Sequence, residues 1–192
     1  MWGDEQQRTV VRERFKGLLD SHRAELAPVA RQALEGDLVL AQGDRARSLL
    51  LLTEGQVAIQ LRHRDNSPHT LTVLEAEELL GEMGLFGDGF HSADVRVVAG
   101  PAQLIEVDSD AVLRAMLFDA DLAMAMLTLL SQRCQGGNAV IGLLLDAITS
   151  AAQGDGAALA TITEHLRRLD HSLAAAAAQL VTLSGRRSAP AG

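Results

Sequence analysis

Hydrophobic positions change their spacing twice along this chain, and the changes predict three kinds of segment. Over residues 6–34 apolar residues recur every three or four positions, which predicts one or two short amphipathic helices in an N-terminal flank at residues 1–35. Over residues 36–108 the apolar runs become short, rich in Val, Ile, Leu and Thr, and bounded by Gly, Asp, Asn and Pro. Runs of this kind predict β-strands joined by turns.

The predicted strands favour an antiparallel arrangement. Val57, Ile59 and Leu61 show the two-residue alternation of a strand with one buried face. Residues 63–69 contain Asp, Asn, Ser and Pro between two such runs, and we expect a hairpin connection there. Many short strands separated by turn signals indicate a β-sandwich or a small barrel rather than a parallel sheet.

Helical spacing returns after the last predicted strand. Residues 109–152 carry an apolar stripe typical of packed helices, and the Gly-Asp-Gly turn at 154–156 predicts a break. Residues 155–184 then follow an a/d heptad pattern without an error, through Leu159, Ile162, Leu166, Leu169, Leu173, Ala176, Leu180 and Leu183. Two interpretations stay open: this helix binds another protein molecule, or it packs on the chain's own core. We expect residues 185–192 to be a disordered tail.

Composition and charge argue against several classes of protein. The formal net charge is -8 at pH 7 and no basic face is evident, so nucleic-acid binding is not expected. The N-terminal sequence MWGDEQQRTV lacks the apolar core of a signal peptide, and no apolar run reaches the ~18 residues of a membrane span. We therefore expect a cytoplasmic protein without membrane contact. The single cysteine, Cys134, cannot form an intramolecular disulfide, and we interpret it as a small buried apolar residue on a helix.

A more specific signal comes from an ordered set of motifs. The chain contains, in this order and before its long helical segment, LEGDLVLAQGD, LLLLTEGQVAIQL, LLGEMGLFGDGFHSA and VRVVAGPAQLIEVD. Together they resemble a cyclic nucleotide-binding domain of the catabolite-activator and protein-kinase regulatory type. The resemblance implies a mainly β plus α fold: an antiparallel jelly-roll β-sandwich at residues 36–108, with N-terminal helices and a long C-terminal helical segment. It also implies that the helices of residues 109–152 close the ligand pocket and form a dimer seam.

The resemblance assigns roles to the residues of a phosphate-binding cassette. Gly81 lets a ligand approach the backbone, and the short helix beginning near Glu82 offers N–H groups to an anion. The carboxylate of Glu82 falls where the family accepts a hydrogen bond from the ribose 2′-hydroxyl. His91, Ser92 and Ala93 fall where the family has an arginine and then Ser or Thr to bind the cyclic phosphate. The implied ligand is cyclic AMP or cyclic GMP, with no metal.

His91 is the departure from the family pattern. Histidine offers at most two N–H donors and is mostly uncharged at pH 7, since its ordinary pKa is about 6.5. Losing a hydrogen bond to a charged group costs about 1.5–3 kcal/mol, or roughly ten- to a hundredfold in affinity. Arg96, in the following strand, is not expected to compensate. Three outcomes stay open: ordinary cyclic nucleotide binding, binding of a different anion, and a pocket that takes no ligand.

The long helix is, by the same resemblance, the place where two chains meet. Aligning it on the family brings Asn138 to the base-contact region, so Asn138 is a candidate base or cross-subunit contact; a solvated surface residue is the alternative. We expect a homodimer. The chain has no H-x-H metal pair on a strand, no P-loop and no G-x-S-x-G elbow, so we expect no enzyme activity.

Two functional hypotheses follow. In the first, the chain is a stand-alone sensor in which a cyclic nucleotide changes the posture of the C-terminal helices and signals to a partner protein. In the second, the domain is degenerate and acts as an oligomeric scaffold or adaptor without ligand. The stretch after Gln153 is too short for the winged helix-turn-helix of the family's transcription factors, so we expect no DNA-binding module.

Overall fold

The structure, a computed structural model, describes residues 5–62, 67–169, 178–179 and 181–182. The chain divides into two compact units, one of Asp4–Leu130 and one of Ser131–Gly192 with Met1–Gly3. Helix α5 (Ala120–Gln153) contributes residues to both.

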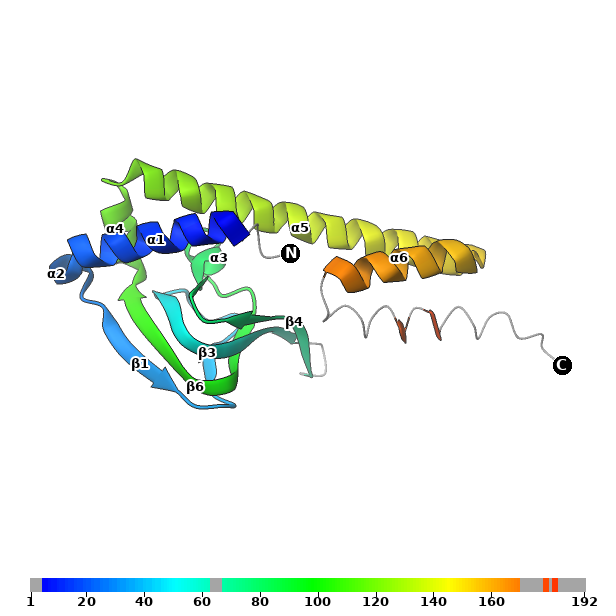
Figure 1. Ribbon diagram of the computed structural model, residues 1–192, viewed down its shortest axis with the longest axis horizontal. Helices are drawn as coiled ribbons and strands as arrows, with labels where there is room; N and C mark the ends of the chain where they lie inside the picture. The colour runs from blue at the N-terminus through cyan, green and yellow to red at the C-terminus, as the bar shows by residue number, and fades with distance from the viewer. Residues whose placement is uncertain (1–4, 63–66, 170–177, 180, 183–192) are drawn as a thin grey trace. The chain divides into compact units, whose positions relative to one another are not determined.

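The first unit is built on an antiparallel six-stranded sheet (Figure 1). Its strands are β1 (Val29–Ala33), β2 (Leu38–Leu40), β3 (Ser48–Arg62), β4 (Pro68–Glu75), β5 (Glu78–Leu80) and β6 (Asp94–Asp108). The long strands β3 and β6 pair with each other, while β1 and β5 flank one half of this pair and β2 and β4 flank the other. This topology confirms the antiparallel jelly-roll sandwich, and β3 and β4 pair as the two arms of the expected hairpin.

Glycine 55 marks the point where the long strands change partners. The register of β3 against β6 shifts between Leu52 and Val57, and Gly55 lies in this stretch with a φ of 89°. A Cβ at Gly55 would lie 2.8 Å from the Ala102 Cα, which is closer than any real contact allows. Glycine is therefore required both by the backbone angle and by the close approach of β6, and the irregularity bends the strand pair.

Helices cover one side of the sheet and complete the core. These are α1 (Glu5–Ser21), α2 (Arg23–Leu26), α4 (Ser109–Met116) and the first turns of α5. Their buried faces and the sheet share one cluster, made of Val11, Phe15, Leu18, Leu19, Leu26, Leu49, Leu51, Leu79, Val107, Ala111, Val112, Ala115, Met116, Leu122, Ala125, Met126 and Leu129. The burial of these side chains supplies the main stabilisation of the unit.

The N-terminal flank is less helical than the sequence pattern predicts. Residues Val29–Ala33 form β1 and pair with β6 instead of continuing the helices. Four of the five β1 residues are exposed, so the strand lacks the alternation of buried and exposed residues that is typical of a strand with one buried face. The pairing partner, which the local sequence does not reveal, decides the conformation here.

The second unit contains a helical hairpin. Helix α5 ends at Gln153, Gly154 takes a φ of 74°, and the Asp155 carboxylate accepts a hydrogen bond from the Ala158 N–H, 3.0 Å away, at the start of α6 (Gly156–Leu169). These features make the break predicted at 154–156 a tight turn, because Gly suits the left-handed angle and Asp is a favourable N-cap.

Helix α6 packs on α5 with residues of the predicted heptad seam. Leu166 is fully buried, and with Ile162 it packs against Val140, Leu143 and Leu144 of α5. Within the described part of the seam, packing on the chain's own helix is therefore what occurs. The remaining seam residues Leu173, Ala176, Leu180 and Leu183, and the tail at 185–192, lie outside the described residues.

Candidate ligand-binding cassette and helix face

The cassette begins where β5 ends. Gly81 follows β5 with a φ of 91° and caps the one-turn helix α3 (Glu82–Leu85). A Cβ at Gly81 would lie 3.1 Å from the Ser48 carbonyl oxygen, so this position favours glycine for both backbone angle and space. The side chain of Glu82 points into the unit, with only 3% of the residue exposed. The Gly-Glu pair thus forms the turn into a short helix that the sequence predicts, and the carboxylate of Glu82 is buried.

His91 lies inside the same corner. The backbone N–H of His91 donates to the Asp44 carbonyl oxygen (2.8 Å), and the backbone carbonyl oxygen of His91 accepts from the Gly43 N–H (2.9 Å). The imidazole Cε1 would be 3.5 Å from a Cβ placed on Gly81, so the ring packs beside that glycine. Only 7% of His91 is exposed. The structure therefore brings Gly81, Glu82 and His91 together, although eight residues of sequence lie between the last two.

The charge around the imidazole is negative. Burial lowers the pKa of His91 below its ordinary value, because removing the ring from water disfavours its charged form. The carboxylates of Asp44 and Glu82 act in the opposite direction, but the balance is a lowered pKa. At neutral pH the ring is therefore uncharged, and the position where the family has an arginine carries no positive charge.

The two residues after His91 are less enclosed. Ser92 is exposed and Ala93 is half-buried, where the chain enters β6. Arg96, the other arginine of this segment, donates to the Gly36 carbonyl oxygen at 2.6 Å. This hydrogen bond holds its guanidinium group at the Gly36 turn.

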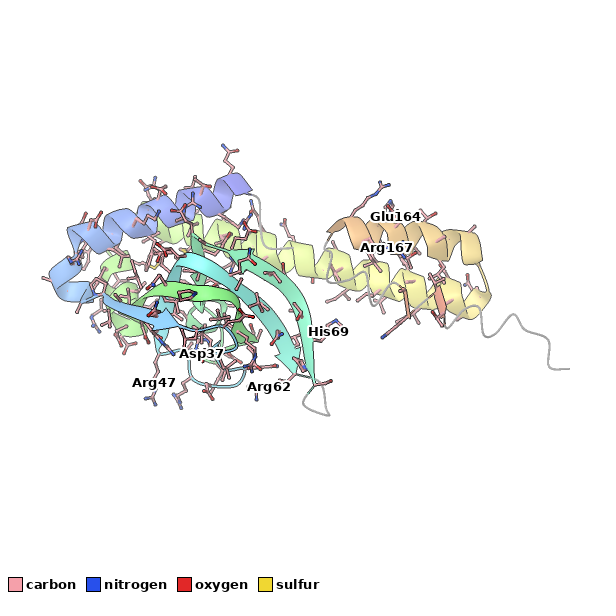
Figure 2. All side chains as sticks on the ribbon, turned by 60° about the horizontal axis from the view of Figure 1, so that its bottom comes forward. Asp37, Arg47, Arg62, His69, Glu164 and Arg167 are labelled. Carbon is pink, nitrogen blue, oxygen red and sulfur yellow. The ribbon has the colours of Figure 1, made fainter. Side chains whose placement is uncertain are left out.

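A buried carboxylate next to the cassette was not predicted. Asp94 is 5% exposed, and its Oδ1 accepts hydrogen bonds from the Gln42 N–H (2.6 Å) and from Arg62 Nε (3.2 Å) and Nη2 (2.9 Å). Arg62 Nη2 also donates to the Gln42 carbonyl oxygen (2.6 Å), and Gln42 Oε1 accepts from the Arg62 N–H (2.9 Å). Figure 2 shows Arg62 at the edge of the sheet where β3 ends. This network fixes the turn after β2 beside His91. The sequence signal that could have indicated it is Asp94 itself, an acidic residue directly after the His-Ser-Ala motif.

Helix α5 presents an exposed heptad face in the second unit. Seven residues at alternating spacings of three and four are exposed on it: Ser131, Cys134, Asn138, Ile141, Leu145, Ile148 and Ala152. The apolar members Ile141, Leu145 and Ile148 each expose more than half of their surface. The residues that contact α6 lie on a different face of the helix, so α6 does not cover the exposed face.

Two residues of this face were predicted from the sequence. Asn138 is exposed and occupies an a position of the heptad, which leaves its assignment as a base or cross-subunit contact untested. Cys134 is exposed, so the expectation of a buried cysteine is wrong. Apolar residues at helical spacing predicted that α5 packs on one face, but Leu122, Met126 and Leu129 are buried while Ile141, Leu145 and Ile148 are not. The stripe changes face along the helix, and Cys134 falls on the exposed one.

Neither a membrane helix nor a metal centre is found in the described part of the chain. No described helix is long and apolar enough to cross a membrane. No described group of three or more His, Cys, Asp or Glu side chains is placed to hold a metal ion.

Comparison with known proteins gives a consistent result. Residues 30–117 match the family model described as the cyclic nucleotide-binding domain. None of the curated protein sequences matches the chain significantly. Among solved structures, the sensor domain of the transcriptional regulator DNR from Pseudomonas aeruginosa is 26% identical with a TM-score of 0.53, over 64% of this chain and 89% of that one.

Two further structures share the fold at lower identity. The catabolite activator protein of Thermus thermophilus is 22% identical with a TM-score of 0.62, over 89% of this chain and 82% of that one. The c-di-GMP-responsive global regulator CLP of Xanthomonas campestris is 18% identical with a TM-score of 0.50, over 72% of this chain and 69% of that one. The matched family model describes a ligand-binding domain.

Proposed function

We propose that this chain, whose residues 30–117 match the model of the cyclic nucleotide-binding domain, is a sensory regulator that binds cyclic AMP or cyclic GMP in its cassette and signals through its C-terminal helices. One observation supports the proposal most directly: Gly81, the buried carboxylate of Glu82 and the buried imidazole of His91 lie close together. A regulatory role also fits the similarity to the sensor domain of DNR.

Each group has a part in binding such a ligand. Gly81 supplies the left-handed turn that begins α3, and Glu82 is placed to accept a hydrogen bond from the ribose 2′-hydroxyl. His91 donates to the cyclic phosphate from one ring nitrogen, and it gains a positive charge only by taking up a proton. Since its pKa starts low, that protonation costs part of the binding free energy, and the affinity is weaker than an arginine would give.

The exposed face of α5 fits a second copy of the chain. Its a/d spacing is that of a two-helix seam, and the polar Asn138 at an a position would fix the register of two copies by pairing with itself. Ile141, Leu145 and Ile148 would be buried in such a homodimer. A change in the helix pair on ligand binding is then the route by which a partner protein reads the signal.

Titration of the full chain with each nucleotide tests the sensor function. We expect thermal unfolding, followed by circular dichroism, to shift upward with cyclic AMP or cyclic GMP. The Glu82→Ala variant should lose the shift, and Glu75→Ala, which removes an exposed carboxylate on β4, should keep it. Absence of any shift in the native chain at millimolar nucleotide would contradict the proposal.

The second candidate function, a ligand-free scaffold, is favoured by one observation. The imidazole that stands in for the arginine is uncharged and faces two carboxylates, which disfavours a phosphate. If a nucleotide stabilises the His91→Arg variant but not the native chain, the native pocket is degenerate toward cyclic nucleotides, and the sensor function in its cyclic nucleotide form is excluded. Deleting α6 is a poor test of assembly, because it would expose Val140 and Leu144 on α5.

A further inference from the structure

A cavity lies on the first unit, and its lining contains none of the cassette residues. It has a volume of about 360 Å³ and is lined by Lys16, Leu19, Asp20, Arg23, Pro28, Ala30, Leu51, Thr53 and Ile105. These residues come from α1, α2, the turn before β1, and the strands β1, β3 and β6. None of them belongs to the cassette. The volume falls within the range of roughly 300–1,000 Å³ for small-molecule sites.

The inner part of this cavity is apolar. Leu19 and Leu51 belong to the main hydrophobic core, with 7% and 1% of their surface exposed, and Ile105 packs against that core. Pro28 and Ala30 add apolar surface from the strand side. An apolar group that enters the cavity therefore extends the existing core and loses contact with water.

The lining also holds three charged side chains, two of them cationic. Lys16 Nζ lies 2.8 Å from Glu77 Oε1 and 3.6 Å from Glu13 Oε1, so its charge is largely neutralised. Asp20 contributes one negative charge to the lining. Arg23 is exposed, and in the part of the chain that the structure describes no ion pair engages its guanidinium group. Arg23 is therefore the group in this lining that is best suited to hold an anion.

The backbone at this corner is held in an uncommon conformation. Ala27, at the end of α2, has a φ of 42° and a ψ of 55°, which is left-handed and unfavourable for alanine, and it precedes Pro28. Such a conformation persists only where the surrounding structure imposes it. It turns the chain from α2 into β1, and both elements contribute to the lining of the cavity, through Arg23 and Ala30.

We propose that this cavity binds a small amphipathic carboxylate. The apolar body lies against Leu19, Leu51 and Ile105, and the carboxylate pairs with the guanidinium group of Arg23, whose planar N–H groups match two carboxylate oxygens. The bound molecule joins α1 and α2 to β1, β3 and β6. This site is independent of the cyclic nucleotide cassette and does not rest on the function proposed for it.

Octanoate is a suitable probe, with octan-1-ol as the uncharged control of equal chain length. Isothermal titration of the full chain should show binding of octanoate, at least about tenfold tighter than that of octan-1-ol, since a hydrogen-bonded ion pair is lost in the alcohol. The Arg23→Gln variant should bind octanoate about tenfold more weakly. Arg31→Gln is the matched control, because Arg31 is also an exposed arginine but does not line the cavity.

A second variant tests the apolar part. Ala30→Phe places a ring in the cavity and should abolish octanoate binding. If that variant does not fold, Arg23→Gln decides alone, because its side chain is exposed and its loss does not disturb the core. The proposal is overturned if millimolar octanoate does not bind, if octan-1-ol binds equally well, or if Arg23→Gln binds octanoate as the native chain does.

Discussion

The affinity for a cyclic nucleotide should rise as the pH falls, and His91 is the reason. In the free protein, burial lowers the pKa of His91 and keeps the imidazole uncharged, although the carboxylates of Asp44 and Glu82 raise that pKa. A bound cyclic phosphate adds a third negative charge beside the ring and raises its pKa. Binding is therefore coupled to proton uptake at pH values between the low pKa of the free protein and the higher pKa of the complex.

The size of this effect is bounded by linkage. With one proton taken up, the affinity increases by at most tenfold for each pH unit within that window, which is about 1.4 kcal/mol per unit. Above the pKa of the complex both states are uncharged and the affinity is constant. Below the pKa of the free protein both states are charged and the affinity is constant again.

Titration calorimetry at several pH values between 8 and 5.5 measures the coupling directly. Repeating each titration in two buffers with different ionisation enthalpies gives the number of protons taken up per nucleotide. In the His91→Arg variant the charge is permanent, so its affinity should be higher at pH 8 and nearly independent of pH. A native chain that binds with the same affinity at all these pH values and takes up no proton would refute the reasoning.

Without ligand, the same residue should make the fold less stable in mild acid. The folded-state pKa of His91 is lowered, so below about pH 6.5 the unfolded chain binds a proton that the folded chain does not. Stability from this source is complete above pH 6.5 and is lost as the pH falls toward the folded-state pKa. Urea unfolding of the native chain and of His91→Gln at pH 7.5 and 5.5 should show a larger loss in the native chain; equal losses would contradict the assignment.

Three other predictions concern packing. Gly55→Ala should cost about 2 kcal/mol or more in urea unfolding because its Cβ meets the backbone of β6, whereas Gly36→Ala, with a similar φ of 91° and open space, should cost only about 1 kcal/mol; equal costs would disprove the steric argument. Asp94→Ala should cost about 2 kcal/mol in the same assay, since it leaves the Gln42 N–H and Arg62 Nε without their acceptor, and a loss below about 0.5 kcal/mol would be inconsistent with the network. Ile141→Asp should convert the proposed homodimer to a monomer in light scattering at unchanged helix content; an unaltered mass above that of a monomer would place the interface elsewhere.

The sequence predicted the fold and the centre of the cassette because their signals are local. Gly81 needs a left-handed backbone angle, and glycine is the residue that supplies it, so the turn is visible in the sequence itself. The order of motifs that resembles the family indicated Glu82 and His91 as cassette positions, but it did not predict that both residues are buried. The strand pattern was equally clear where β3 is buried.

What the sequence did not predict depends on distant partners. β1 is a strand because β6 offers it an edge, and its own exposed residues carry no strand signal. The network of Asp94, Gln42 and Arg62 joins three segments that are far apart in the chain. Cys134 is exposed because α6 covers a different face of α5, which depends on the direction in which the chain turns at Gly154.

The backbone pairing around His91 has a consequence for the speed of ligand entry. The amides of Gly43, Ala46 and His91 are all bonded between two short segments, the turn after β2 and the loop after α3. Three such bonds between two segments break and form together, so the amide hydrogens should exchange with solvent at one common rate. That rate measures how often the corner opens, and a ligand that needs the opening cannot associate faster than it occurs.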